Sequence, residues 1–147
     1  MNPTPALNDA EQQALAVALD DEYKSHETYQ QVIRDFGPAR PFINSVEAEA
    51  RHISALLALL APLALFALFA KYAVAPPANR WAGKAPRHAG VHDACVAGVQ
   101  GETDNVVIYD GLLLTTQRSD LLDVLHALRS ASQDRHLPTF QRCARRG

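Results

Sequence analysis

The chain has 147 residues, of which 48% are hydrophobic and 20% are charged, and its formal net charge at pH 7 is -2. This length suits one domain, and the composition is typical of a soluble globular protein rather than a disordered one. Affinity for phosphate backbones comes mainly from clustered cationic side chains, which a nearly neutral chain lacks. We therefore expect a single domain over residues 1–147 that does not bind nucleic acid.

Hydrophobic periodicity and helix-end signals predict four amphipathic helices, at residues 9–36, 41–72, 91–115 and 119–145. The first begins with the capping-box pattern Asn8-Asp9-Ala10-Glu11 and ends before Gly37. Pro138 should kink the last part of the fourth. The Pro- and Gly-rich segment from Ala75 to Gly90 is predicted to be a loop that Trp81 pins to the helices. Short loops and this one longer connection predict an all-α fold, either an up-and-down bundle or a ferritin-like antiparallel four-helix bundle.

Each predicted helix carries polar or ionisable residues on the face that its apolar stripe assigns to the core. They are Glu22 and His26 in the first helix, Glu49 and His52 in the second, Glu102 in the third, and Gln133 and His136 in the fourth. An unpaired buried carboxylate or imidazolium is costly, so such groups must become neutral, pair, or coordinate a metal. A buried cluster of hydrogen bonds without metal is the alternative to a metal site.

Carboxylate-bridged di-iron bundles take one Glu from each of two helices and a Glu-x-x-His from each of the other two. The i, i+3 spacing places both side chains on one helix face, where they can share or flank one ion. Five of the six positions agree here in type and order, namely Glu22, Glu49, His52, Glu102 and His136. The sixth is Gln133, whose amide can coordinate but brings no charge, so a second ion would be held more weakly.

His26 lies one helical turn after Glu22 and has two interpretations. It is either an additional metal ligand that compensates for Gln133, or a core histidine bonded to Tyr109 or a glutamate. We favour the core histidine, because a group that is neutral near pH 7 can be buried with a single partner.

Four segments resemble ferritin-like proteins of the rubrerythrin type, and particularly an uncharacterised bacterial branch of that superfamily. They are DDEYKSHETYQQVI, RPFINSVEAEARHISALL, ACVAGVQGETDNVVIYD and SASQDRHLPTFQRC, and together the resemblance covers nearly the whole chain. It implies a non-haem iron bundle, with relatives that reduce peroxide, oxidise ferrous iron or store it. The ligand set suits iron, with manganese or zinc as alternatives. An oxidoreductase of the ferroxidase or peroxidase-like kind is one implied activity.

The two cysteines, Cys95 and Cys143, are far apart, and the sequence has no C-x-x-C. A rubredoxin-type iron centre is therefore absent, and any catalytic electrons would have to come from a separate donor. The cysteines could form one disulfide, but two unpaired thiols in a reducing compartment are the favoured expectation. Residues 1–20 lack the basic start and apolar centre of a secretory signal, which indicates a cytoplasmic protein.

The run from Ile53 to Ala70, ISALLALLAPLALFALFA, is uncharged and approaches the length of a membrane span. Its alanine content and Pro62 argue against insertion, and insertion would also remove Glu49 and His52 from the bundle. We therefore expect a helix outside the membrane whose surplus apolar surface either pairs two copies as a homodimer, which is favoured, or folds back at Pro62. This surface also supports an alternative function, in which a metal-poor or single-metal bundle acts as a structural or interaction module.

Overall fold

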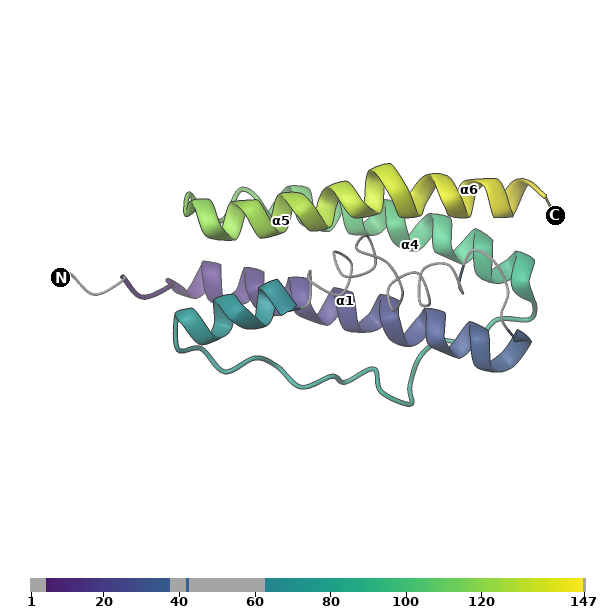
Figure 1. The fold of residues 1–147 in the computed structure, drawn as a ribbon, viewed down its shortest axis with the longest axis horizontal. Helices are drawn as coiled ribbons and strands as arrows, with labels where there is room; N and C mark the ends of the chain where they lie inside the picture. The colour runs from purple at the N-terminus through teal and green to yellow at the C-terminus, as the bar shows by residue number, and fades with distance from the viewer. Residues whose placement is uncertain (1–4, 38–41, 43–62, 147) are drawn as a thin grey trace.

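The computed structural model describes residues 5–37, 42 and 63–146, and all regular elements in these ranges are helices (Figure 1). They are α1 (Asp9–Phe36), α4 (Val91–Leu112), α5 (Ser119–Ala131), the π-helical segment η1 (Ser132–His136) and α6 (Leu137–Arg145), and residues 63–71 are also helical. The all-α prediction is thus confirmed. Most of the predicted second helix, including Glu49 and His52, lies outside the described residues.

Helix α1 begins and ends as its sequence predicts. The Asn8 side chain accepts a hydrogen bond from the Glu11 N–H at 2.8 Å, and the Glu11 carboxylate accepts one from the Asn8 N–H at 3.1 Å. These two bonds satisfy N–H groups that have no partner within the helix. At the other end Gly37 adopts φ 79° and its N–H donates to the Ile33 carbonyl at 2.8 Å. Glycine tolerates that left-handed conformation without a steric penalty.

The predicted fourth helix extends over the expected residues but is not α-helical throughout. Five residues, Ser132–His136, form the π-helical segment η1 directly before α6. Pro138 lacks an N–H, and in a regular α-helix its ring would clash with the carbonyl four residues earlier. A π-helical turn is wider, and it relieves this conflict while the chain stays helical. The departure from regular α-helix near Pro138 thus takes the form of a π segment that ends two residues before the proline.

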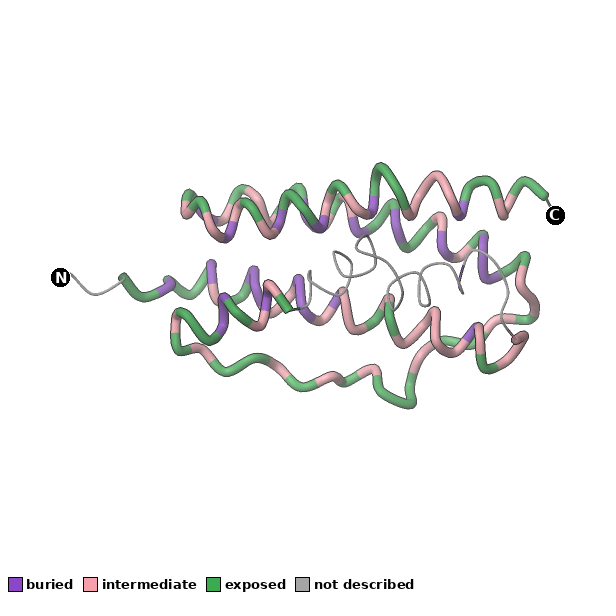
Figure 2. Tube along the Cα trace, in the orientation of Figure 1, coloured by how far each residue is buried: buried purple, intermediate pink, exposed green. Residues whose placement is uncertain are grey.

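Helix α4 is the central element of the described bundle, since it packs against α1, α5, η1 and α6. Buried residues follow the inward faces of the helices (Figure 2). They form two apolar clusters. The first comprises Leu7, Leu15, Ala18, Leu19, Leu65, Leu68, Phe69, Tyr109, Leu121, Leu125 and Leu128, and the second comprises Val32, Phe42, Ala94, Cys95 and Phe140. Along α1, α4 and the fourth helix alike, a polar stretch separates the residues of one cluster from those of the other.

The connection between residues 72 and 90 runs beside α1 (Figure 1). Trp81 donates its indole N–H to Asp20 at 3.2 Å, and Arg80 forms a two-pronged ion pair with the same carboxylate at 2.6 and 2.9 Å. Arg87 pairs with Asp35 in the same way further along α1. The prediction that Trp81 pins this loop to the helices is confirmed.

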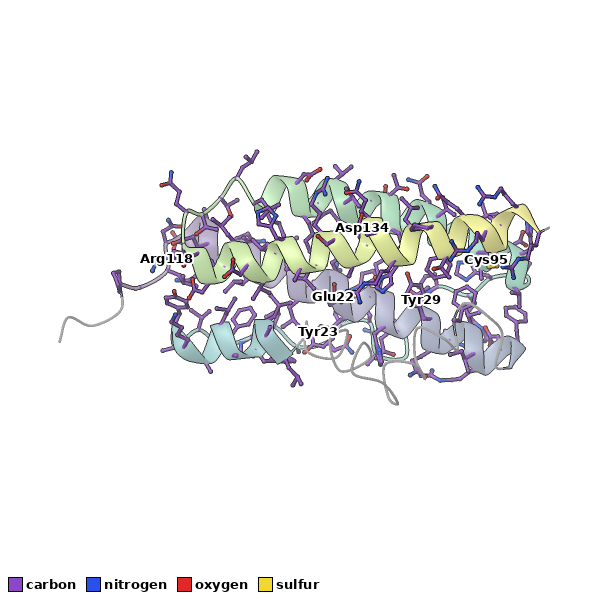
Figure 3. The ribbon with its side chains drawn as sticks, turned by 45° about the horizontal axis from the view of Figure 1, so that its top comes forward. Glu22, Tyr23, Tyr29, Cys95, Arg118 and Asp134 are labelled. Carbon is purple, nitrogen blue, oxygen red and sulfur yellow. A yellow bond between two sulfur atoms is a disulfide. The ribbon has the colours of Figure 1, made fainter. Side chains whose placement is uncertain are left out.

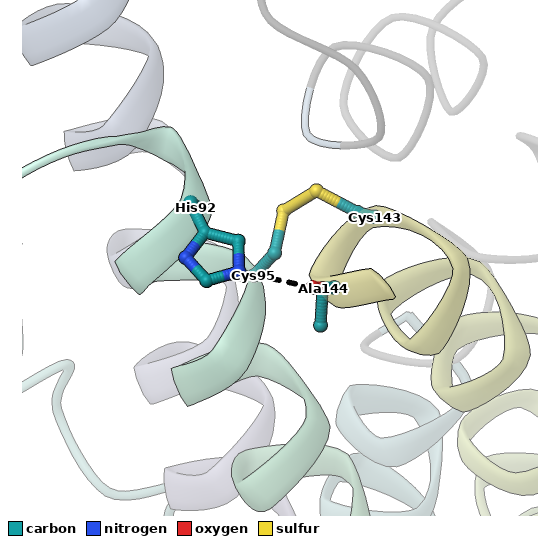
Figure 4. The surroundings of a disulfide bond; sticks show 4 residues. All are labelled: His92, Cys95, Cys143 and Ala144. Carbon is teal, nitrogen blue, oxygen red and sulfur yellow. Dashed lines mark hydrogen bonds between the residues drawn. A yellow bond between two sulfur atoms is a disulfide. The ribbon is translucent and has the colours of Figure 1, made fainter. Parts of the chain in front are cut away.

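A disulfide joins Cys95 to Cys143, so the expectation of two unpaired thiols is wrong (Figure 4). The first turn of α4 and the last turn of α6 lie side by side, which brings the two Cα atoms to 5.8 Å. Such proximity depends on helix packing and leaves no local sequence signal. Closing a loop between residues 48 positions apart restricts the unfolded chain, and the entropy model assigns this about 4 kcal/mol.

None of the helices in the described ranges has the length and apolar character needed to cross a membrane. Most of the apolar run from Ile53 to Ala70 lies outside these ranges. In its described part, Leu65, Leu68 and Phe69 are buried in the first apolar cluster, whereas Leu63 is 56% exposed.

Candidate metal centre

A layer of polar side chains lies between the two apolar clusters. Helix α1 contributes Asp21, Glu22 and Tyr29, helix α4 contributes Glu102, Asn105 and Tyr109, and η1 contributes His136. Figure 3 shows Glu22 midway along the bundle, between Arg118 near one end and Cys95 near the other. The apolar clusters on both sides bury Glu102 and Tyr109 almost completely, which strengthens the electrostatic interactions of these two residues.

Glu102 is the most deeply buried carboxylate of the layer, with 1% of its surface exposed. The Tyr29 hydroxyl donates to Glu102 Oε1 at 2.5 Å, and Nδ1 of His136 lies 3.5 Å from the same oxygen. The Tyr29 ring is held between Phe42 and Phe140, with centroid distances of 5.8 and 5.2 Å. Burial and the adjacent Glu102 raise the Tyr29 pKa well above its usual value, so this hydroxyl keeps its proton.

Tyr109 connects the other two acids of the layer. Its hydroxyl lies 2.7 Å from Glu22 Oε1 and 3.1 Å from Asp21 Oδ2, and the tyrosine itself is fully buried. A single hydroxyl proton can satisfy only one of these carboxylates well at a time. Burial, together with the charges of the neighbouring carboxylates, raises the pKa of Glu22 to about 7 and that of Asp21 to about 6. Near pH 7 the layer therefore holds a proton that isolated carboxyl groups would have lost.

Asn105 lies within hydrogen-bonding distance of both Asp21 and Glu102. With its amide nitrogen turned toward α1, it donates to the two Asp21 oxygens at 2.8 and 2.9 Å and to the Gly101 carbonyl at 3.0 Å. Neutral donors therefore surround the acids, and no Lys or Arg forms an ion pair with Asp21, Glu22 or Glu102 in the part of the chain that the structure describes. Among the described residues, the basic groups that act on these acids are His136, which lies beside Glu102, and Lys24, whose charge lowers the pKa of Asp21.

Three of the five principal ligands predicted from the sequence meet in this layer. Glu22, Glu102 and His136 come from three different helices, and the charges of Glu102 and His136 both influence the pKa of Glu22. Glu49 and His52 lie outside the described residues. Within residues 5–37, 42 and 63–146, no three His, Cys, Asp or Glu side chains are grouped closely enough to hold a metal ion.

The two less certain ligands are not part of the layer. His26 is exposed, so the prediction that it is a core residue is wrong. Helix α1 turns its buried face toward Asp21 and Val32, which lie on the other side of the predicted stripe. Gln133 is also exposed and accepts a hydrogen bond from Arg129. It lies within η1, where a wider turn prevents positions i and i+3 from sharing a face as they would in an α-helix.

Sequence reasoning missed Asp21 and Asn105, which are both buried. A weak signal existed for Asn105, since it follows Glu102 by three residues and so shares its helix face. Asp21 gave no comparable signal, because it lies in an acidic run with Asp20 and Glu22 that is as typical of a solvated helix face.

A cavity of about 410 Å³ between α1 and α4 reaches this layer. Small residues of α4, including Ala97, Gly98 and Gly101, leave the space, while Asp21, Tyr29 and Asn105 are among the polar residues that line it. A small molecule from solvent can thus come into contact with Tyr29, the residue that donates to Glu102.

Comparison with known proteins identifies a structural relative but no family. No family model matches the sequence, and no curated protein matches it. The fold is similar to the crystal structure of a hypothetical protein from Methanococcus jannaschii DSM 2661, with a TM-score of 0.76 and 16% sequence identity. The match covers 99% of this chain and 86% of the other. At this identity the similarity establishes a shared fold and nothing about function.

Proposed function

We propose that the protein is a ferritin-like four-helix bundle that binds non-haem iron and reacts with oxygen or peroxide. The proposed ligands are Glu22, Glu49, His52, Glu102 and His136. The observation that supports the proposal is the placement of Glu22, Glu102 and His136, from three helices, in one polar layer that contains neutral donors but no Lys or Arg ion pair among the described residues, so that Glu49 and His52 would have to complete the site.

The electrostatics of the layer fit a divalent cation. Burial disfavours the charged form of Glu22 and Asp21, nearby carboxylates add repulsion, and the raised pKa values of the two groups reflect both costs. A bound cation would add positive charge beside the three carboxylates, and it would favour the deprotonated form of Glu22. Carboxylate and imidazole donors together suit iron, manganese or zinc.

The described residues also have definite supporting roles. Tyr29 and Tyr109 donate to Glu102 and Glu22 and so restrict the orientation of each carboxylate. The cavity beside α4 admits a small oxidant as far as Tyr29. Bound iron would supply the electron-transfer chemistry toward that oxidant. Because the sequence contains no C-x-x-C, a catalytic cycle would need a separate electron donor.

Metal content and affinity test the proposal. Untagged protein purified without chelators should contain iron, manganese or zinc by plasma mass spectrometry, and anaerobic titration should reveal at least one tight ferrous site per chain. Glu102→Gln should weaken binding by at least about tenfold, since ligand and supporting residues commonly have effects of this size or more. The matched control is Glu11→Gln, which alters another buried carboxylate outside the layer and should leave affinity unchanged. Equal iron binding by wild type and Glu102→Gln would refute the assignment.

The alternative function, an interaction module that pairs through the second helix, is supported by the exposed Leu63. Leu65 and Phe69 fill the core of the chain itself, so substitutions there would disrupt the fold and could not test pairing. Leu63→Glu is the suitable variant. A homodimer that survives chelation, dissociates with Leu63→Glu and binds no metal would favour this alternative over the iron site.

A further inference from the structure

Helices α4 and α6 run antiparallel, and three pairs of facing residues mark their register. Cys95 is bonded to Cys143. Three residues further along α4 and three back along α6, Gly98 faces Phe140 so closely that a Cβ on Gly98 would lie 2.7 Å from the ring. Four residues further again, Glu102 Oε1 lies 3.5 Å from His136 Nδ1. The disulfide and the Glu102–His136 pair are thus separated by seven residues on each helix.

This spacing connects the disulfide mechanically to the proposed metal centre. Seven residues make nearly two α-helical turns, so Cys95 and Glu102 project from the same face of α4. The seven residues from His136 to Cys143 place both side chains on the corresponding face of α6. The disulfide at Cys143 therefore fixes which face of this helix meets α4 at His136, roughly 10 Å further along the axis.

The π-helical segment explains why α6 needs an anchor of its own. A π segment contains one more residue per turn than an α-helix. The side chains of α6 are therefore rotated about the helix axis relative to the positions that a continuous α-helix from α5 would give them. His136 is the last residue of η1 and follows the rotation of α6. A shift of one residue would rotate its ring by about 100° and remove it from Glu102. The disulfide and the close Gly98–Phe140 contact both resist such a shift.

We propose that the Cys95–Cys143 disulfide positions His136 against Glu102, and that reduction of this bond weakens the metal site. The second half of the proposal rests on the proposed function, whereas the first half concerns His136 alone. Cys95 and Cys143 are then positioning residues, because neither reaches the proposed site. The hydrogen bond between His92 and the Ala144 carbonyl, 2.9 Å long, remains after reduction and keeps α6 near α4 while its rotation is released (Figure 4).

Reduction can be carried out with a water-soluble trialkylphosphine. Cys143 is partly exposed and Cys95 is fully buried, so phosphorus attacks the Cys143 sulfur and the Cys95 sulfur leaves as a thiolate. Water then hydrolyses the phosphorus–sulfur bond. The products are one phosphine oxide and two cysteine thiols, so the two electrons gained by the sulfurs come from phosphorus. Desalting removes the reagent before metal is added.

Two readouts test the proposal on the full chain. The first is the NMR signal of the His136 ring in metal-free protein, assigned by loss of a peak in His136→Gln. The second is the affinity for ferrous iron in anaerobic titration. We expect reduction, and separately the double variant Cys95→Ser with Cys143→Ser, to move the His136 signal and to lower iron affinity at least tenfold. Reoxidation should restore both in the wild type.

A variant destabilised elsewhere separates positioning from general loss of stability. Leu125→Ala opens a gap in the first apolar cluster, away from the disulfide, and should leave the folded protein's His136 signal and iron affinity unchanged. Unchanged signals and affinity after verified reduction would overturn the proposal, as would equal changes in Leu125→Ala. A His136 signal that moves on reduction in a protein that binds no metal in either state would refute the iron site while supporting the positioning role.

Discussion

Two regions of the bundle bury carboxylates in opposite ways. Glu11, at the start of α1, accepts hydrogen bonds from the Thr116 hydroxyl at 2.5 Å and from Arg118 at 3.0 Å. Burial alone would raise its pKa, but these donors and the Asn8 N–H outweigh burial and lower it. Glu22 has Tyr109 as its hydrogen-bond donor, and its pKa rises to about 7. The same helix therefore carries one buried acid that is kept charged and one that is driven toward neutrality.

The difference indicates what each acid does. Arg118 pairs with Glu11 and also donates to the carbonyls of Pro5 and Ala6. These bonds hold the start of α1 and the residues before it against the residues that precede α5, which is a structural role. The central layer has no corresponding arginine or lysine ion pair among the residues that the structure describes. In the described part of the chain, an arginine pairs with Glu11 while the acids of the layer have no Lys or Arg ion pair, and this difference is consistent with a cation from solution at the second place.

The largest predicted effect comes from Glu22→Gln in metal-free protein. Between pH 4.5, its usual pKa, and about 7, folded Glu22 holds a proton that the unfolded chain has lost. The free energy of unfolding should therefore fall as pH rises through this range, by about 3 kcal/mol at most. Gln stays neutral, so the variant should be more stable than wild type at pH 8 by up to that amount and nearly equal at pH 4.5. Urea unfolding of wild type and variant at pH 4.5 and pH 8 measures the difference in their free energies of unfolding. The same difference at both pH values would contradict the prediction.

The opposite substitution, Glu11→Gln, should destabilise the protein by about 1 to 3 kcal/mol at pH 5 and at pH 8, because an amide leaves Arg118 without its charged partner. The sign follows from the lowered pKa of Glu11, since its contribution is complete above the usual value of 4.5 and is lost only as pH falls through the folded value. The same urea experiment applies. A stabilising effect at pH 8 would remove the contrast between the two regions.

The sequence predicted the fold and the candidate site only in part, for physical reasons. Helix α1 was predictable to the residue, because a capping box and a terminal glycine act locally. The core position of Glu102 followed from helical periodicity and was confirmed. The rotation of α1 about its own axis was predicted only approximately from its apolar residues. Asp21 was therefore missed, and His26 was wrongly placed in the core. The disulfide and the π segment depend on packing between distant helices, which no local pattern encodes.

A smaller effect is expected from Tyr109→Phe, which keeps the buried ring and removes one hydroxyl. Its hydrogen bonds lower the pKa values of Glu22 and Asp21, so their loss should raise both pKa values further. Hydrogen bonds to charged groups contribute about 1.5 to 3 kcal/mol, and the lower figure applies here because Glu22 is only partly charged near pH 7. Destabilisation should therefore be larger at pH 8 than at pH 5. A cost independent of pH would show that Tyr109 acts on packing alone.

The smallest predicted effect separates the two roles of Glu11. Its carboxylate pairs with Arg118 and also closes the capping box with Asn8. Asn8→Ala removes the side-chain half of the cap but leaves the ion pair intact, and it should cost about 1 kcal/mol at both pH 5 and pH 8. If Glu11→Gln costs no more than Asn8→Ala, the pair with Arg118 contributes nothing, and the two buried acids differ only in helix capping. If Glu11→Gln costs more, the excess measures the ion pair with Arg118, which has no Lys or Arg counterpart in the central layer among the residues that the structure describes.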